Sequence, residues 1–284
     1  FVVLQDIFET CEVWQIFFFM IVAKYSGMRV LLFNYPGQAF TEWRRDATLN
    51  NEYLAGVTEA LLGYLSKHGN GEFALEDGQA PFYMMGVGNG GAIASSFVTT
   101  YMGRHPNLRG LLMLNGHMYL DAHLAGVYHD CMNVFACTPA SRPDLPVYFF
   151  SRYLFSPTYL SKVGAPLALN LYTAVHNPIT LEGRIQLCQG ALSHVDVRDS
   201  IERLSLPIIS VASSKDGFIK PLHVQAAIAC RGGEERSIKR VLTTRRRLCV
   251  IWLRAGHELL QEARRPLSNL VEQLATGYHE RNDV

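Results

Sequence analysis

The sequence lacks an excess of charge of either sign, because 26 basic side chains balance 25 acidic ones. Surfaces that bind nucleic acid or anionic membranes carry a large basic excess, so we expect neither as a main partner. Only 18% of the 284 residues are charged, and 49% are apolar. This composition supports a sizeable core and excludes a chain that is disordered throughout.

Paired cysteines are also missing. The six cysteines contain no Cys-x-x-Cys motif and stand at positions 11, 131, 137, 188, 230 and 249. Isolated thiols are typical of a reducing compartment and argue against a disulfide framework or a zinc site. We therefore expect a cytoplasmic or other reducing intracellular location, with no metal and no cofactor. Histidines such as His117 and His123 fit scattered polar or cap-lining roles better than a metal site.

An apolar run long enough to cross a bilayer is absent as well. The longest run ends at Ala23 and is flanked by Glu12 and Lys24, and it is shorter than the ~20 residues that a membrane span requires. It also lacks a small-residue cleavage site, so no signal peptide is expected. The chain begins at Phe1 without a methionine, and we expect it to be a piece of a longer protein.

Short apolar runs alternate with segments of helical spacing along most of the chain. The apolar runs predict strands at residues 1–4, 29–33, 81–85, 108–115, 207–211 and 248–253. The periodic segments predict helices at residues 13–26, 51–68, 92–103, 222–230 and 258–278. Continuously apolar strands separated by helices indicate a parallel sheet covered on both faces.

The alternation stops between residues 116 and 197, where prolines and aromatic residues become frequent. We interpret this stretch as a helical insertion over the sheet. Its aromatic part, residues 146–159, either lines a pocket or forms a contact face for another protein. A second open feature is the stretch 231–247 with its seven basic residues, which is either a solvated face or an interface for an acidic partner.

A glycine-rich turn follows the strand predicted at residues 81–85 and reads GVGNGG over residues 86–91. A strand, a sharp glycine turn and a helix form the context of a nucleophile elbow, Gly-x-Ser-x-Gly. In this register the nucleophile position is Gly88, which has no side chain. The neighbouring Asn89 carries an amide, which is a poor nucleophile. The spacing also departs from the Gly-x-Gly-x-x-Gly pattern of a dinucleotide-binding loop.

Two further loops carry an acid and a histidine. Asp216 follows the strand predicted at 207–211, and His257 follows the last predicted strand. The order nucleophile, acid, histidine is that of a hydrolase triad, in which the acid orients the imidazole that accepts the nucleophile's proton. Two other interpretations stay open: His257 acts on water as a general base, or the pair is a retained hydrogen bond that stabilises two loops.

These features together resemble the α/β-hydrolase fold family over nearly the whole chain. They are the first strand and its following helix, the turn NYPGQA at residues 34–39, the glycine elbow, the Asp216 segment and the Gly256-His257 segment. The resemblance implies an α/β fold with a mostly parallel sheet, helices on both faces and a helical cap. We therefore predict a hydrolase core at residues 1–115 and 198–284 and a cap insertion at residues 116–197.

The sequence departs from the family pattern at two places that concern activity. Gly88 stands where relatives carry serine, cysteine or aspartate. Gln5, Asp6 and Ile7 stand where relatives commonly carry His-Gly, and with Asn89 they form the predicted oxyanion loop. The carboxylate of Asp6 would oppose a developing oxyanion. Removing a triad nucleophile costs on the order of 10⁶ in turnover, so the sequence predicts loss of hydrolysis.

The resulting prediction is a catalytically degenerate α/β-hydrolase-fold protein that is not an enzyme. In this interpretation Asp216 and His257 are vestigial, and the chain is a structural, scaffolding or binding component of a protein assembly. Its expected partners are other proteins, and the capped pocket suits a small apolar ligand. The alternative is a residual, serine-independent hydrolase or a ligand receptor that uses the Asp216–His257 pair in the capped pocket.

Overall fold

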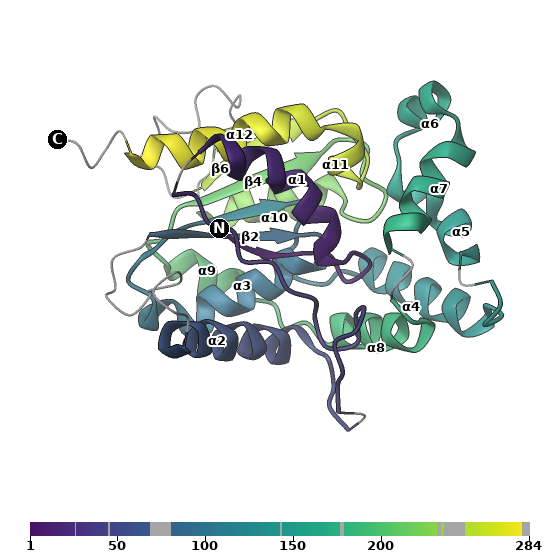
Figure 1. The fold of residues 1–284 in the computed structure, drawn as a ribbon, viewed down its shortest axis with the longest axis horizontal. Coiled ribbons are helices and arrows are strands. Elements are labelled where there is room, and N and C mark those ends of the chain that lie inside the picture. Colours follow the sequence, from purple (N-terminus) through teal and green to yellow (C-terminus); the bar gives the residue numbers. More distant parts are fainter. Residues whose placement is uncertain are drawn as a thin grey trace.

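The computed structural model describes residues 1–25, 27–44, 46–68, 81–142, 144–176, 179–231, 234–235 and 248–279. At its centre is a parallel sheet whose described strands follow the order β1-β2-β3-β4-β6-β5 (Figure 1). The strands are β1 (Val2–Leu4), β2 (Phe82–Val87), β3 (Leu108–Leu114), β4 (Ile208–Ser213), β5 (Glu234–Glu235) and β6 (Leu248–Leu253). The predicted parallel sheet is therefore confirmed.

Residues 29–33, predicted as a strand, lie beside β1 without forming a ladder. A single bridge joins Leu31 to Val2, and the Leu31 N–H donates to the Phe1 carbonyl at 2.8 Å. The prediction of a full strand is wrong here. An edge segment has a sheet neighbour on one side alone, and its apolar side chains are half-buried rather than buried in the core.

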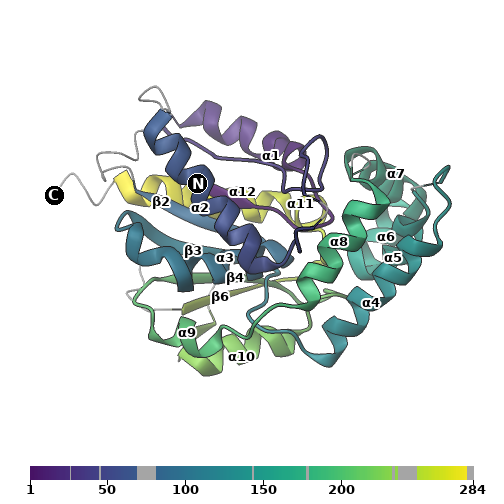
Figure 2. The same cartoon turned by 90° about the horizontal axis from the view of Figure 1, so that it is seen from below.

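Helices cover both faces of the sheet, as the apolar strands require (Figures 1 and 2). One face carries α1 (Cys11–Lys24), α11 (Leu259–Glu262) and α12 (Arg264–His279); the other carries α2 (Asn51–His68), α3 (Asn89–Tyr101), a short 3₁₀ turn (Met102–Arg104), α9 (Arg198–Arg203) and α10 (Pro221–Arg231). Because successive strand residues point to opposite faces, Val3 and Met85 pack against α1 and α12, whereas Leu4 and Met84 pack on the other side.

Five more helices gather at the carboxyl ends of the strands, beside the sheet (Figure 2). They are α4 (Ala122–Cys137), α5 (Leu145–Leu154), α6 (Pro157–Val163), α7 (Ala165–His176) and α8 (Leu181–Leu192). The prolines that disrupt the sequence pattern have a local explanation, because Pro146 and Pro157 lie in the first turns of α5 and α6, where a missing N–H is harmless. The division into core and cap at residues 116 and 197 stays a prediction.

No helix within the described ranges is long and apolar enough to cross a membrane. The basic stretch 231–247 lies outside the described residues except for positions 231, 234 and 235.

Candidate active site

Three side chains from separate loops meet at the carboxyl edge of the sheet. Asp6 follows β1, Asp216 follows β4 and His257 follows β6. The His257 Nδ1 lies 2.9 Å from Asp216 Oδ2, and the His257 Nε2 lies 2.9 Å from Asp6 Oδ2. All three residues are at most 7% exposed. The structure thus brings Asp216 and His257 together as expected and adds a second carboxylate on the opposite side of the imidazole.

The elbow has the backbone that its glycines suggested. Gly88 joins β2 to α3 with φ +53° and ψ −123°, a conformation that favours glycine. A Cβ added there would overlap Asp6 Oδ2 and lie 2.5 Å from Asp6 Cγ. Gly90 has a related role, since a Cβ on it would collide with the carbonyl oxygens of Leu4 and Gln5. Because Gly90 has no Cβ, the start of α3 can approach the end of β1, and this brings Asp6 over Gly88.

The other oxygen of the same carboxylate is held by two backbone amides. Asp6 Oδ1 accepts from the Ile7 N–H at 2.6 Å and from the Asn89 N–H at 3.3 Å. In an α/β-hydrolase the residue after the nucleophile and the loop after the preceding parallel strand supply the oxyanion hole, and Asn89 and Ile7 stand at these positions. Asn89 is also the first residue of α3, where the helix dipole favours an anion.

The expectation that the Asp6 carboxylate would oppose an oxyanion stays a prediction. In the structure this carboxylate lies with one oxygen on the two amides and with the other against His257. Gln5 lies in the loop after β1, and its part in an oxyanion loop stays a prediction. Its side chain donates to the Phe33 carbonyl at 2.8 Å and to Gln38 Oε1 at 3.0 Å.

The two carboxylates determine the charge of the imidazole. Burial alone would lower the pKa of His257, but the charge of Asp216 and its hydrogen bond, followed by those of Asp6, raise the pKa of His257 well above its ordinary value. An imidazolium between these two carboxylates can donate from both nitrogens, one to each carboxylate. Asp216 is oriented in turn, because its Oδ1 accepts from the Phe218 N–H at 2.7 Å and the Ile219 N–H at 2.9 Å.

A buried glutamate that the sequence analysis missed supports the Asp6 loop. Glu9 Oε2 accepts from the Trp14 Nε1–H at 2.8 Å and from the Asp6 N–H at 3.3 Å. Burial, with a further contribution from the charge of Asp6, raises the pKa of Glu9 to about 7. Burial also raises the pKa of Glu258 well above its ordinary value. This pKa places the titration of Glu9 near neutral pH, next to Asp6.

Two amide side chains that sequence reasoning also missed hold the loops in register. Asn115 directly follows β3 with φ +47°, and its Nδ2 donates to Ser213 Oγ and to the His257 carbonyl, both at 3.0 Å. Gln38 Nε2 donates to the carbonyls of Ile7 at 3.2 Å and Glu9 at 2.8 Å. The available signals were an asparagine at a strand end, which tolerates positive φ, and the place of Gln38 in the NYPGQA turn.

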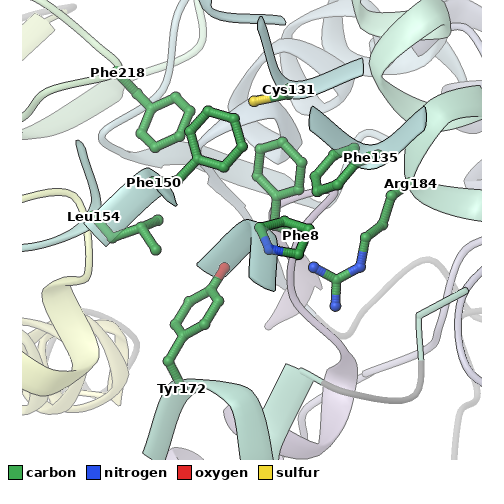
Figure 3. Close-up of a pocket in the computed structure, with 9 residues that line it drawn as sticks. Phe8, Cys131, Phe135, Phe150, Leu154, Tyr172, Arg184 and Phe218 are labelled. Atoms are coloured by element: carbon green, nitrogen blue, oxygen red, sulfur yellow. The ribbon is translucent and has the colours of Figure 1, made fainter. Parts of the chain in front are cut away.

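An apolar pocket lined by side chains of α4, α5, α7 and α8 adjoins Asp6, Asp216 and His257 (Figure 3). It contains about 260 Å³ of space that no atom fills, including its open mouth. Phe8 and Phe218 form a wall that it shares with the triad, because Phe218 packs against the imidazole of His257 with ring centroids 4.8 Å apart. The remaining lining residues are Cys131, Phe135, Pro146, Phe150, Leu154, Tyr172 and Arg184.

The other histidines lie apart from the triad. His117 lies next to His194 and His223, with ring centroids 5.6 and 6.1 Å away, and His123 Nε2 lies 3.3 Å from the Gly217 carbonyl. Burial lowers the pKa of His117 well below its ordinary value. Within the described part of the chain, no group of three or more His, Cys, Asp or Glu side chains could hold a metal ion.

Comparison with known proteins identifies the fold. No protein-family model and no curated protein sequence matches the chain, but solved structures match over nearly its whole length. MGS-M2, an α/β-hydrolase enzyme from a Medee basin deep-sea metagenome library, is 15% identical with a TM-score of 0.73 and covers 98% of this chain and 88% of its own. The chain has the α/β-hydrolase fold.

Two further structures support the same assignment. The enol-lactonase from Burkholderia xenovorans is 13% identical with a TM-score of 0.72, and the match covers 98% of this chain and 90% of the lactonase. A thermophilic esterase from Thermogutta terrifontis is 15% identical with a TM-score of 0.71, and the match covers 99% of this chain and 89% of the esterase. At these identities the likeness concerns the fold.

The prediction that the chain is not an enzyme is contradicted by this comparison, because the similar structures are a hydrolase, a lactonase and an esterase. A scaffolding role likewise receives no support. The error has a physical reason. The sequence analysis considered position 88, Asn89 and water as the attacking group but not Asp6, whose carboxylate occupies the space above Gly88 and lies 2.9 Å from His257 Nε2.

Proposed function

We propose that this chain is a serine-independent hydrolase in which Asp6 is the attacking group, His257 transfers protons and Asp216 orients His257. The position of the Asp6 carboxylate carries the proposal. Its Oδ2 lies 2.9 Å from His257 Nε2 in the space of an elbow side chain, and its Oδ1 is bound by two amides. Carboxylates serve as nucleophiles in several enzyme classes through ester intermediates.

The occupied amides favour a particular kind of substrate. A carbonyl oxygen cannot enter the site of the Ile7 and Asn89 amides while Asp6 Oδ1 lies there, so attack on an acyl carbon lacks its usual stabilisation. Attack by Oδ2 on a saturated carbon needs no such stabilisation of a substrate oxygen. An epoxide fits best, because its leaving oxygen departs on the side of the carbon away from Oδ2 and requires a proton, which the imidazolium of His257 supplies through an intervening water.

In the first step Asp6 Oδ2 forms a bond to an epoxide carbon as the carbon–oxygen bond of the ring breaks. The leaving oxygen, on the far side of that carbon, takes a proton from a water that is itself reprotonated by His257 Nε2, which leaves a neutral imidazole and an ester on Asp6. In the second step His257 accepts a proton from water as that water attacks Asp6 Cγ. The negative charge then develops on Oδ1, where the two amides already point.

The tetrahedral intermediate collapses by breaking the bond between Cγ and the ester oxygen. His257 returns a proton to the departing alkoxide, and the product is a diol. Asp6 now holds one oxygen from water and passes its carboxylic proton to His257, which restores the carboxylate–imidazolium pair. The diol keeps an oxygen that belonged to Asp6, and this transfer distinguishes the covalent route from direct attack by water.

The test is turnover on small epoxides with apolar substituents, beside matched esters and lactones. Asp6→Asn and His257→Gln should each reduce turnover by several orders of magnitude, up to about 10⁶ for loss of the attacking group. Asp46→Asn changes an exposed aspartate and serves as the matched control. Absence of turnover on every substrate, with folded protein, would overturn the hydrolase assignment.

A single turnover in ¹⁸O-labelled water, with enzyme in excess, tests the role of Asp6. The peptide that contains Asp6 should gain one heavy oxygen, and the first diol released should contain none. Heavy oxygen in the first diol with none in Asp6 would mean that water attacks the substrate directly. If the chain hydrolyses esters and Asp6 gains no heavy oxygen, the chain is a hydrolase but Asp6 is not its nucleophile.

A further inference from the structure

Three buried histidines lie where the chain enters and leaves the group of helices α4 to α8. His117 stands in the connection from β3 to α4, His194 in the connection from α8 to α9, and His223 in the first turn of α10. The ring centroid of His117 lies 5.6 Å from that of His194 and 6.1 Å from that of His223. These three residues, the histidine cluster, therefore connect both ends of the helix group to a helix that packs on the sheet.

The two connections are also joined directly beside the cluster. The Val197 N–H donates to the Met118 carbonyl at 3.1 Å. His223 Nε2 lies 3.3 Å from Asp121 Oδ2, and Asp121 in turn caps α4 by accepting from the Leu124 N–H at 2.8 Å. The start of α4 and the segment after α8 are thus held at one place.

Burial disfavours a positive charge on each member of the cluster. All three residues are at most 7% exposed. Burial lowers the pKa of all three, and it lowers that of His117 well below its ordinary value. Neither ring nitrogen of His117 has a hydrogen-bond partner among the residues that the structure describes. A buried imidazolium at this position would lack a compensating acceptor, which is costly.

The surrounding charges make His117 the member least able to carry a proton. It faces His194, His223 and His257, whose positive charges would each oppose its own. The other two members face carboxylates as well: Glu52 and Asp196 at His194, and Asp121 and Asp216 at His223, where His123 also lies and where Arg198 covers the Tyr119 ring that packs on His223. His117 therefore accepts a proton readily only after its ring has left the cluster.

We propose that the histidine cluster is a pH-sensitive latch: acid opens it at His117, and α4 and α8 then move away from the loops that carry Phe8 and Phe218. The two helices pack side by side (Figure 2), and their side chains line the pocket together with those two rings. Opening the latch therefore widens the way into the pocket. The latch acts in the same way whatever reaction the triad performs.

The neighbouring helices have an attachment of their own. Ser156, which caps α6, donates its backbone N–H to Glu262 Oε1 at 2.6 Å, and the Glu258 N–H donates to the Leu154 carbonyl at 2.9 Å. These bonds do not involve the cluster, so α5 and α6 stay attached when the latch opens. The movement therefore concerns the two connections together with α4 and α8.

Proton linkage gives the size of the effect. A released imidazole regains its ordinary pKa of 6.5, whereas the closed form binds a proton only at much lower pH. Between pH 7.5 and pH 5 the ratio of open to closed latch should then rise by up to roughly 30-fold for His117 alone.

Hydrogen–deuterium exchange of the unaltered protein at pH 7.5 and pH 5, corrected for the intrinsic effect of pH on exchange, tests the latch. Protection in peptides that cover residues 116–125 and 193–201 should fall by roughly 10- to 30-fold at the lower pH. The Val197 amide is the most direct reporter. Two features should mark a local opening: this protection stays below that of β2 and β3 at both pH values, and low concentrations of urea barely change it.

Variants identify the group that responds to acid. His117→Asn should remove most of the pH dependence in the two connections. His129→Asn changes an exposed histidine of α4 and should leave that dependence intact. If His117→Asn does not fold, His117→Phe takes its place, because it keeps a flat ring at this buried position.

Three results would overturn the latch. They are equal protection of the connections at the two pH values, urea-sensitive exchange that the connections share with the strands, and a pH dependence of unchanged size in folded His117→Asn or His117→Phe. The second result would mean that acid unfolds the whole chain instead of opening it at the cluster. If neither variant folds, the dependence of the unaltered protein on pH and urea decides the question.

Discussion

Replacing Gly88 by serine should not restore a serine hydrolase, because Asp6 already fills the space. A Cβ at position 88 would lie 2.5 Å from Asp6 Cγ and overlap Oδ2. Such overpacking costs about 1–3 kcal/mol, and the backbone at φ +53° adds about 1–2 kcal/mol for a residue other than glycine. We expect Gly88→Ser to lower the free energy of unfolding by about 2–5 kcal/mol and to leave ester turnover at background.

The double variant Asp6→Gly/Gly88→Ser removes the overlap and empties the two amides. The double variant should be about 1–3 kcal/mol more stable than the two single losses of stability predict when they are added, because the steric part of the cost is gone. The new hydroxyl then stands on the elbow beside His257, with the oxyanion hole vacant. A burst with an activated short-chain ester, and labelling of position 88 by a serine-directed probe, should appear in the double variant alone.

Urea denaturation of the four proteins, with the ester burst measured on each, checks both parts. The single variant Asp6→Gly is the control, because it empties the site without supplying an attacking group. If Gly88→Ser proves as stable as the unaltered protein, or if the two substitutions are additive, Asp6 does not occupy the space above Gly88. The argument that links the two positions would then be refuted.

Other perturbations test the surroundings of the triad. The pKa values of His117, His194 and His223 are lowered in the folded chain, so the unfolded chain binds more protons below pH 6.5. The free energy of unfolding should therefore fall as pH drops below 6.5, by up to about 1.4 kcal/mol per pH unit for each group. In denaturation experiments at several pH values, His117→Asn should make this fall less steep. The raised pKa of Glu9, about 7, has the opposite sign: its contribution is complete below pH 4.5 and is lost as pH rises through 7, so Glu9→Gln should gain stability relative to the unaltered protein as pH rises over that interval. Asn115→Ala should lower turnover more than it raises KM. It should also lower the free energy of unfolding by about 1–3 kcal/mol, since it leaves buried partners at the ends of β4 and β6 unpaired. Turnover equal to that of the unaltered protein would exclude a positioning role for Asn115.

The fold was predictable from the sequence because its signals are local. The glycines at residues 86–91 require a tight strand-to-helix turn, and the loops of Asp216 and His257 each follow an apolar strand whose end lies at the same sheet edge. Residues 29–33 could not be classified correctly, because an apolar run does not reveal whether a strand has one neighbour or two. The side-chain directions of Gln5 and Asp6, adjacent in the chain, likewise depend on contacts with Gln38 and the elbow.

The proposed replacement of the attacking group by Asp6 could not be predicted from the sequence for a related reason. A triad requires an acceptor within hydrogen-bond reach of one imidazole nitrogen, and this fixes where the acceptor lies in space but not where it stands in the sequence. At a parallel sheet edge that point is close to more than one strand end, so the β1 loop can supply a group that the β2 elbow lacks. A pattern search that assigns one role to one position detects the missing side chain and overlooks its neighbour.

The two departures from the family pattern are consequently a single feature. Asp6 can enter the site because Gly88 has no Cβ, and an elbow residue with a side chain would exclude the carboxylate from its present position. Aspartate at position 6 and glycine at position 88 therefore depend on each other sterically, and each appears as a defect when it is considered alone. Together they place one carboxylate oxygen on His257 and the other on two amides, and the proposed carboxylate nucleophile depends on this arrangement for both formation and hydrolysis of its ester.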